Sequence, residues 1–294
     1  MNVTFRRPTP ADVESLAKLV FDAFASLQDR HNFPRDFPAR EMAQGFMAAW
    51  SAHPKVWGVV AEAPDGHIVG CNFLSERNVV AGVGPVCVDP SVQGGGIGRK
   101  LMQAVLARAR EIGSDRVRLV QEPFNTVSLS LYTSLGFDVR EPLAVMRGQP
   151  AGNTAAAAGG AVRPITEADL PACTELCRRV HGFDRTAELR DAMAHFQPVA
   201  LERGGRIVAY ASAPTFYLLN HAVAETEQDM QALLSGAAAA QTGGQPISLI
   251  VPIRNSALFR WCLSNGLRVV KPMTLMSLGE YQEPRGSWVP SVEY

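Results

Sequence analysis

Hydrophobic and polar residues follow strand and helix periods in a regular order along the first half of the chain. Helix-period stripes cover residues 10–28, 39–52, 97–112 and 125–135, and strand-like patterns cover 2–7, 56–63, 67–75, 80–88 and 116–121. Pro64-Asp65-Gly66 predicts a hairpin turn between two of these strands, and a final hairpin is expected through Pro142 to Met146. This order predicts an α+β fold, with helices layered on a sheet that has a crossover in its middle.

The second half of the chain repeats the first. Residues 162–170 match residues 5–13, including a Thr-x-Ala-Asp sequence that predicts a strand running into a capped helix. Residues 125–146 align without a gap on residues 255–276. Residues 149–161 lack charge and bulky side chains, as is typical of a flexible linker. The sequence therefore predicts two copies of one fold, at 1–148 and 162–294, joined by that linker.

Composition narrows the classes of function. The 294 residues carry 28 Lys and Arg against 28 Asp and Glu, so the formal net charge is zero, which argues against a nucleic-acid binder with a basic face. No apolar run is long enough for a membrane span, so we expect a cytoplasmic protein. The five cysteines have no paired spacing and the six histidines form no ligand motif, so we expect reduced, mostly buried thiols and no metal site.

The most informative segment is a glycine-rich turn between a predicted strand and a predicted helix. In the sequence Val86-Cys-Val88-Asp-Pro-Ser-Val-Gln93-Gly94-Gly95-Gly96-Ile97-Gly98-Arg99, successive glycines let several backbone N–H groups point at one spot beside a helix N-terminus. Such a spot binds phosphate oxygens. The spacing fits neither the dinucleotide-binding pattern G-x-G-x-x-G nor the P-loop pattern, and a turn that serves only tight packing is the structural alternative.

Gln93-x-x-Gly96-x-Gly98, preceded by Val-Asp-Pro and followed by Asn125-x-x-Ser-x-x-Leu-Tyr132-x-x-x-Gly136-Phe137, resembles the GNAT superfamily of acyl-CoA-dependent N-acyltransferases. The resemblance implies two GNAT-like domains, each with a mixed, mostly antiparallel sheet flanked by helices, of which the first is catalytic. It further implies that the backbone of Gln93, Gly94, Gly95, Gly96, Ile97, Gly98 and Arg99 holds the pyrophosphate of acetyl-CoA. Val86 and Val88 would pair with the pantetheine arm as a strand does.

The same resemblance assigns roles to two residues of the predicted helix 125–135. Tyr132 would protonate the leaving CoA sulfur, and Asn125 would contact the cofactor arm; a core aromatic residue and a helix N-cap are the structural alternatives. No motif marks the base that deprotonates the amine. Glu76 is our candidate, with His31, Asp36 and Glu122 as others, and a chain of water molecules could do the same work.

The second copy has no glycines where the first has its turn. Its sequence there, residues 220–230, contains a Thr226-x-x-Asp229 cap and extra acidic residues that would repel phosphate. The alignment also puts Cys262 opposite Tyr132, so we expect a degenerate, non-catalytic second domain. The aromatic-containing tail, residues 281–294, either packs across the domain junction or lies on the surface. The predicted reaction is transfer of an acetyl group to a small-molecule or peptide amine; the alternatives are an acyl-CoA-binding sensor or scaffold without turnover and a nicotinamide enzyme.

Overall fold

The computed structural model describes residues 2–150 and 160–293, so most of the predicted linker 149–161 lies outside the described residues. The described part of the chain forms two compact units. Unit 1 comprises residues 1–119 and 124–136, and unit 2 comprises residues 120–123 and 137–294. Among the described residues, no helix is both long and apolar enough to cross a bilayer.

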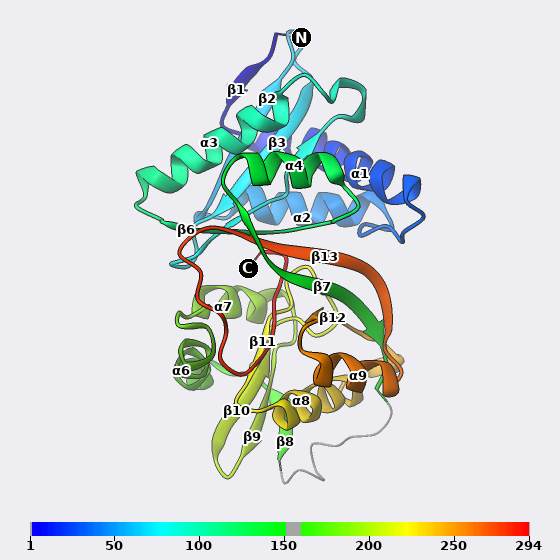
Figure 1. Ribbon diagram of the computed structural model, residues 1–294, viewed down its shortest axis with the longest axis vertical. Coiled ribbons are helices and arrows are strands. Elements are labelled where there is room, and N and C mark those ends of the chain that lie inside the picture. The colour runs from blue at the N-terminus through cyan, green and yellow to red at the C-terminus, as the bar shows by residue number, and fades with distance from the viewer. Residues whose placement is uncertain (1, 151–159, 294) are drawn as a thin grey trace. The chain divides into compact units, whose positions relative to one another are not determined.

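Unit 1 contains a sheet of short strands with two pairs of helices (Figure 1). Its elements are β1 (Thr4–Arg6), α1 (Val13–Arg30), α2 (Arg40–Ala52), β2 (Val56–Glu62), β3 (Ile68–Ser75), β4 (Ala81–Val83), β5 (Cys87–Val88), α3 (Ile97–Glu111), β6 (Arg116–Gln121) and α4 (Thr126–Ser134). The strand order is β1-β2-β3-β4-β6, with β5 paired to β3. Among the described strands of unit 1, the β4–β6 pair is parallel and the other pairs are antiparallel, so the expected mixed, mostly antiparallel sheet is confirmed.

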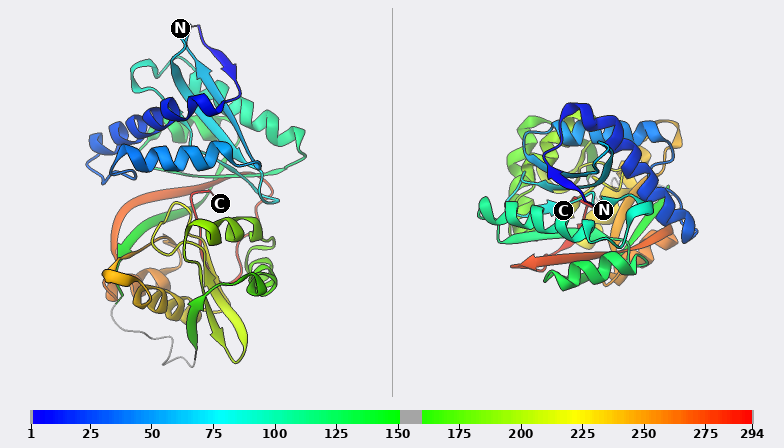
Figure 2. Two further views of the ribbon diagram at one scale, coloured as in Figure 1. Left: turned by 180° about the vertical axis from the view of Figure 1, so that it is seen from behind. Right: turned by 90° about the horizontal axis from the view of Figure 1, so that it is seen from above.

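The two helix pairs of unit 1 cover opposite faces of its sheet. Helices α3 and α4 face the viewer in Figure 1, and α1 and α2 face the viewer when the molecule is turned by 180° in Figure 2. The buried stripe of α3 includes Leu101, Val105 and Leu106, which are at most 4% exposed. This is the 3.6-residue pattern that predicts the helix from the sequence.

Unit 2 holds the second repeat and one strand of the first. Its elements are β7 (Asp138–Gly148), β8 (Ala161–Pro164), α6 (Leu170–His181), α7 (Thr186–His195), β9 (Val199–Arg203), β10 (Arg206–Ala211), β11 (Ala222–Ala224), α8 (Glu227–Ala239), β12 (Ile247–Pro252), α9 (Ser256–Ser264), β13 (Arg268–Gly279) and β14 (Ser287–Val289). Five of its strands follow the order β14-β11-β10-β9-β8. A further three lie in the order β13-β7-β12, and these pairs are antiparallel.

Strand β7 changes two of the sequence predictions. The final hairpin predicted through Pro142 is wrong, because β7 continues from Asp138 to Gly148 without reversing direction. Pro142 lies opposite Thr274 of β13, and its carbonyl accepts a hydrogen bond from the Ile253 N–H at 3.0 Å, so the proline is accommodated within the strand.

The boundary of the compact units also differs from the predicted boundary of the repeats. Strand β7 belongs by sequence to the segment 1–148, but it pairs on both edges with strands of the second repeat. Its residues Ala144 and Met146 are at most 1% exposed and lie in the hydrophobic core of unit 2. The division at 1–148 and 162–294 remains a prediction from the sequence repeat, and the last strand of the segment 1–148 packs in unit 2.

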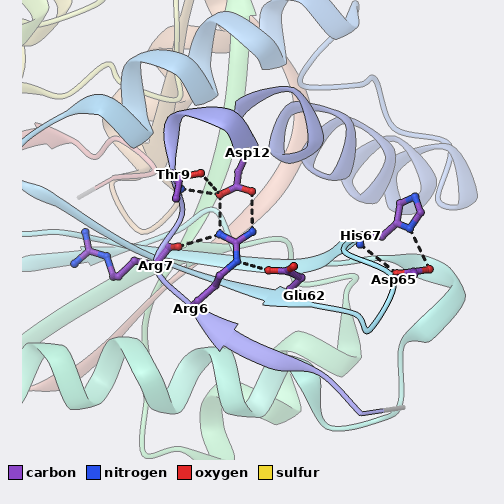
Figure 3. Close-up of polar contacts among 7 residues, drawn as sticks. All are labelled: Arg6, Arg7, Thr9, Asp12, Glu62, Asp65 and His67. Carbon is purple, nitrogen blue, oxygen red and sulfur yellow. Dashed lines mark hydrogen bonds and ion pairs between the residues drawn. The ribbon is translucent and has the colours of Figure 1, made fainter.

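The repeat itself is visible in equivalent ion-pair clusters. In unit 1 the Arg6 guanidinium donates to both carboxylate oxygens of Asp12 at 2.8 and 2.9 Å and to Glu62, and Asp12 also accepts from the N–H and hydroxyl of Thr9 (Figure 3). In unit 2, Arg163 donates to Asp169 at 2.8 Å through each of two nitrogens. The Thr-x-Ala-Asp sequences are thus the capped helix starts that the sequence predicts.

Candidate functional site

The glycine-rich turn presents free backbone donors at the start of α3. Gly94 and Gly96 have φ angles of +87° and +77°, in the left-handed region that favours glycine, and a Cβ placed on either residue would meet no atom within 4 Å. The first main-chain bond of α3 runs from the Lys100 N–H to the Gly96 oxygen at 3.2 Å. The N–H groups of Ile97, Gly98 and Arg99 therefore have no acceptor within the helix. The residues 93–96 are exposed, so a diphosphate can reach these donors.

The strand before the turn has one edge available within unit 1. The Asp89 N–H donates to the Val69 oxygen at 2.9 Å, and Cys87 lies opposite Cys71 of β3. Because hydrogen-bonding groups alternate in direction along a strand, the N–H and C=O of Val88 face away from β3. The Val88 oxygen accepts a bond from the Gln93 side-chain amide at 3.1 Å, which ties the strand to the turn. An extended, amide-bearing ligand that leaves the turn can continue along this edge.

Tyr132 lies beside β5. The side chain is 7% exposed, and it comes from α4. Burial raises the pKa of the Tyr132 phenol above its usual value of about 10, and the nearby Cys87 thiol raises it further. The phenol therefore keeps its proton at neutral pH and can donate it.

Asn125 is the N-cap of α4. Its side-chain oxygen accepts a hydrogen bond from the Ser128 N–H at 3.2 Å, so the capping role is observed. At the other end of this helix, the Ser134 hydroxyl lies 2.9 Å from the guanidinium of Arg99. This bond joins the first turn of α3 to the end of α4, the helix that carries Tyr132 and begins at Asn125.

The candidate bases have different surroundings. Glu76, directly after β3, accepts hydrogen bonds from Arg108 on both carboxylate oxygens, at 2.6 and 3.0 Å. Glu122 is 5% exposed and pairs with the buried Lys271 within unit 2. His31 is exposed at the end of α1 with its ring 5.1 Å from that of Phe124. The backbone N–H of Asp36 donates to the Gln28 side chain at 3.0 Å.

The possible metal ligands and the cysteine thiols have the following surroundings. Among the described residues, no group of three or more His, Cys, Asp and Glu side chains is placed to hold a metal ion. All five cysteines are free and buried, as predicted. The pKa of the Cys87 thiol is raised well above its usual value by the neighbouring Cys71 thiol and by burial. Cys87 is therefore a poor nucleophile.

Sequence reasoning missed a contact at the break between β4 and β5. The Trp50 indole N–H donates to the Gly84 oxygen at 3.2 Å, and the Arg77 guanidinium lies 4.8 Å from the centre of the Trp50 ring. These residues lie at the end of β5 that is remote from the glycine-rich turn. Trp50 ends the apolar stripe of α2, and nothing in the sequence distinguishes it from a core tryptophan.

Known proteins are similar to the first repeat in sequence and to both repeats in fold. Residues 21–137 match the acetyltransferase (GNAT) family. A mycothiol acetyltransferase from Salinispora tropica is 34% identical over 143 residues, which are 46% of this chain and 44% of that protein. The chain thus spans less than half the length of the curated relatives it matches.

Two solved structures cover nearly all of the chain. A candidate acetyltransferase from Pyrococcus horikoshii is 19% identical, with a TM-score of 0.76 over 99% of this chain and 94% of that one. A GCN5-related N-acetyltransferase from Sphaerobacter thermophilus is 17% identical, with a TM-score of 0.61 and 96% of each chain covered. At these identities the likeness shows the fold, and it extends over both repeats. Residues 21–137 therefore match the GNAT acetyltransferase family, and the likeness in fold extends beyond them over the rest of the chain.

Proposed function

We propose that the first repeat, residues 1–148, transfers an acetyl group from acetyl-CoA to a primary amine by direct attack in a ternary complex. The observation that carries the proposal is the turn 93–99, exposed at residues 93–96, whose glycine φ angles and uncapped helix start leave main-chain donors free for a diphosphate. Val86 and Val88 would hold the pantetheine arm, and Asn125 would contact it.

Each step of the transfer has a candidate group in this chain. The amine nitrogen bonds to the thioester carbonyl carbon, the carbon–sulfur bond breaks, and the leaving thiolate takes a proton from Tyr132. A backbone N–H near Val88 would stabilise the oxyanion that develops on the carbonyl. The proton lost by the amine goes to a base.

Glu76 is the base that we propose, although its carboxylate already accepts two hydrogen bonds from Arg108. Each carboxylate oxygen has two acceptor positions, so the two bonds from Arg108 leave room for an amine proton or a water molecule. Glu76→Gln would then lower kcat about 100-fold. Glu62→Gln is the matched control, because Glu62 also pairs with an arginine. If Glu76→Gln and Glu62→Gln lowered kcat by the same factor, the role of Glu76 as the base would be refuted.

The acceptor is proposed as a small molecule or a peptide amine. The curated relatives are named mycothiol acetyltransferase, so a panel of acceptors should start with small-molecule amines and continue with peptide amines. The test is release of free thiol when acetyl-CoA is incubated with each member of the panel. Binding of acetyl-CoA without release on any acceptor would favour the sensor or scaffold alternative.

A nicotinamide enzyme is distinguished by thermal shift. A ligand that binds the native state at 100 times its dissociation constant adds about 2.7 kcal/mol of stability. We expect coenzyme A to raise the melting temperature and NAD or NADP to leave it unchanged. The reverse result would refute the proposal.

A further inference from the structure

The strand pairings of the two repeats define which residues are equivalent. In unit 1, Val60 of β2 lies opposite Cys71 of β3, which lies opposite Cys87 of β5. Arg6 of β1 lies opposite Val60, and its equivalent in unit 2, Arg163 of β8, lies opposite Ala200 of β9. Ala200 lies opposite Tyr210 of β10, which lies opposite Val223 of β11. These three residues therefore correspond to Val60, Cys71 and Cys87.

One equivalent main-chain hydrogen bond in each unit supports this register. The Asp89 N–H donates to the Val69 oxygen at 2.9 Å, and the Glu225 N–H donates to the Val208 oxygen at the same distance. Strand β11 is therefore the counterpart of β5, and Ala224 corresponds to Val88. By the alternation of the antiparallel ladder, the N–H and C=O of Ala224 face away from β10, as those of Val88 face away from β3.

In unit 2, the edge of β11 that corresponds to the free edge of β5 is paired with another strand of the same unit. Strand β14 runs antiparallel along β11, with Ser287 opposite Ala224, Trp288 opposite Val223 and Val289 opposite Ala222. Val289 is fully buried, and Trp288 is 7% exposed. Residues 287–289 of the aromatic-containing tail are therefore a buried edge strand of the five-stranded sheet, and for these residues the surface alternative is wrong.

The glycine-rich turn also has a substitute in unit 2. Eight residues, 89–96, separate β5 from α3, whereas only Glu225 and Thr226 separate β11 from α8. The carboxylate of Glu227, at the first position of α8, accepts hydrogen bonds from the Asn255 amide at 2.8 Å and from the Ser287 hydroxyl at 3.1 Å. A negative group thus lies at the helix start and joins the counterpart of Asn125 to β14.

Contacts beyond the strand hold the tail in place. The ring of Trp288 lies 5.7 Å from that of His181, edge to face. The buried guanidinium of Arg185 donates to the Ser291 hydroxyl at 2.7 Å, and the Val292 N–H donates to the Leu218 oxygen at 3.0 Å. The tail is therefore held by contacts within β14 and after it.

We propose that the tail, residues 287–293, is an internal ligand of the second repeat. Strand β14 takes the position along β11 that a pantetheine arm would take along β5, and the Glu227 carboxylate takes the position of the diphosphate. This inference rests on the proposed function for the position of the pantetheine arm. It follows that the chain binds one coenzyme A molecule although it contains the fold twice.

The first test is the stoichiometry of coenzyme A on the full chain by calorimetry. We expect one molecule per chain for the native protein and none for Gly95→Asp, which puts a negative charge into the turn of the first repeat. Two molecules per chain, or one that remains in the Gly95→Asp variant, would overturn the inference, because the second repeat would then hold a site.

The second test measures the tail directly, by hydrogen exchange at the backbone amides of Ala222 and Ala224. Gly286 enters β14 with a φ of +125°, and a Cβ placed on it would lie 3.2 Å from the Ala224 oxygen. We expect Gly286→Val to speed exchange of the two amides at least about tenfold, which corresponds to 1.4 kcal/mol. Gly205→Val is the matched control, because Gly205 also has a positive φ, of +74°, but open space around it.

A chain that ends at Gly286 covers the case in which Gly286→Val fails to fold. Adding a synthetic peptide of residues 287–293 should restore slow exchange at Ala222 and Ala224, and failure of the peptide to do so would overturn the inference. Fast exchange in the native protein would also overturn it. Slow exchange in a native protein that binds no coenzyme A would refute the proposed transferase and still uphold the pairing of β14 with β11.

Discussion

Tyr132→Phe is the substitution that separates catalysis from binding in the first repeat. It removes one oxygen from a side chain that is 7% exposed and leaves the ring in place, so the packing of α4 is kept. The net contribution of one buried hydrogen bond is about 1 kcal/mol, and we expect the free energy of unfolding to fall by no more than that.

The effect on turnover follows from the surroundings of the phenol. General acids typically contribute 10²- to 10⁴-fold to a rate. Burial raises the pKa of Tyr132 above its usual value of about 10, whereas a thiol has a pKa of about 8.5, so proton transfer to the thiolate is uphill. We therefore expect the lower end of the range, about 100-fold in kcat, which is about 2.7 kcal/mol of transition-state stabilisation.

The assay is colorimetric release of free thiol from acetyl-CoA with a saturating amine, together with calorimetry of coenzyme A. We expect kcat to fall about 100-fold and the dissociation constant of coenzyme A to change less than about threefold. Because the pKa of Tyr132 is raised, its proton is retained as the pH rises, so the native enzyme should show no alkaline loss of kcat below about pH 10 from this group.

Tyr210→Phe is the matched control within the same chain. Tyr210 is 1% exposed, and burial likewise raises the pKa of its phenol, but it lies in unit 2 with its hydroxyl 3.2 Å from His221. This variant should keep the native kcat. A Tyr132→Phe enzyme that keeps more than a third of native kcat, or one that loses coenzyme A binding as well, would refute the role of Tyr132 as the acid.

Three further predictions concern the two caps, a helix glycine and acid stability. Asn125→Ala and Asn255→Ala should each cost about 1 kcal/mol in a denaturant titration through loss of a cap, but only Asn125→Ala should weaken coenzyme A binding; equal affinities would refute the cofactor role of Asn125. Gly45→Ala, at an exposed position inside α2 with open space around it, should add about 0.5–1 kcal/mol of stability, and a loss would contradict the helix. Hydrogen bonds from Arg163 hold the pKa of Asp169 well below its usual range, so this contribution is present above about pH 4 and is lost as the pH falls; melting curves of Arg163→Ala should show a weaker loss between about pH 4 and pH 2 than the native protein.

The sequence predicts local structure well where residue type dictates the backbone. Thr9 and Thr166 each start a helix with Asp three residues later, and both capping boxes are present. The same holds for Gly96, whose left-handed φ fixes the start of α3. Periodicity gives α1, α2 and α3 to within a few residues, because each buries one continuous stripe.

The partner of a strand is what local sequence does not specify. Strand β7 is buried from Leu143 to Met146, which shows that it is a central strand, but the residues that pair with it lie more than a hundred positions later. Likewise, the tail has the turn-forming residues Pro284 and Gly286 directly before a strand of only three residues. Its position depends on the free edge of β11 and on Arg185, neither of which is visible as a pattern.

The residues of the candidate site also differ in how far the sequence predicts them. Residues whose proposed role rests on backbone geometry, such as Gly94 and Gly96, follow from the motif, and both have the left-handed φ that favours glycine. Side chains whose role depends on distant neighbours do not. Glu76 becomes part of an ion pair with Arg108, and Trp50 meets Gly84, through contacts that only the folded chain brings together.

The most direct test of the account is titration of the native chain and of two Gly95 variants with coenzyme A. Gly95 has no positive φ, and a Cβ on it would lie 3.7 Å from the Val92 oxygen, so a side chain is tolerated there. Both Gly95→Ser and Gly95→Asp should fold; the native chain should bind coenzyme A, the serine variant should bind more weakly, and the negative charge of the aspartate variant should abolish binding. If the native chain gives no heat, or if the aspartate variant binds as the native chain does, the turn at residues 93–99 is not a diphosphate site.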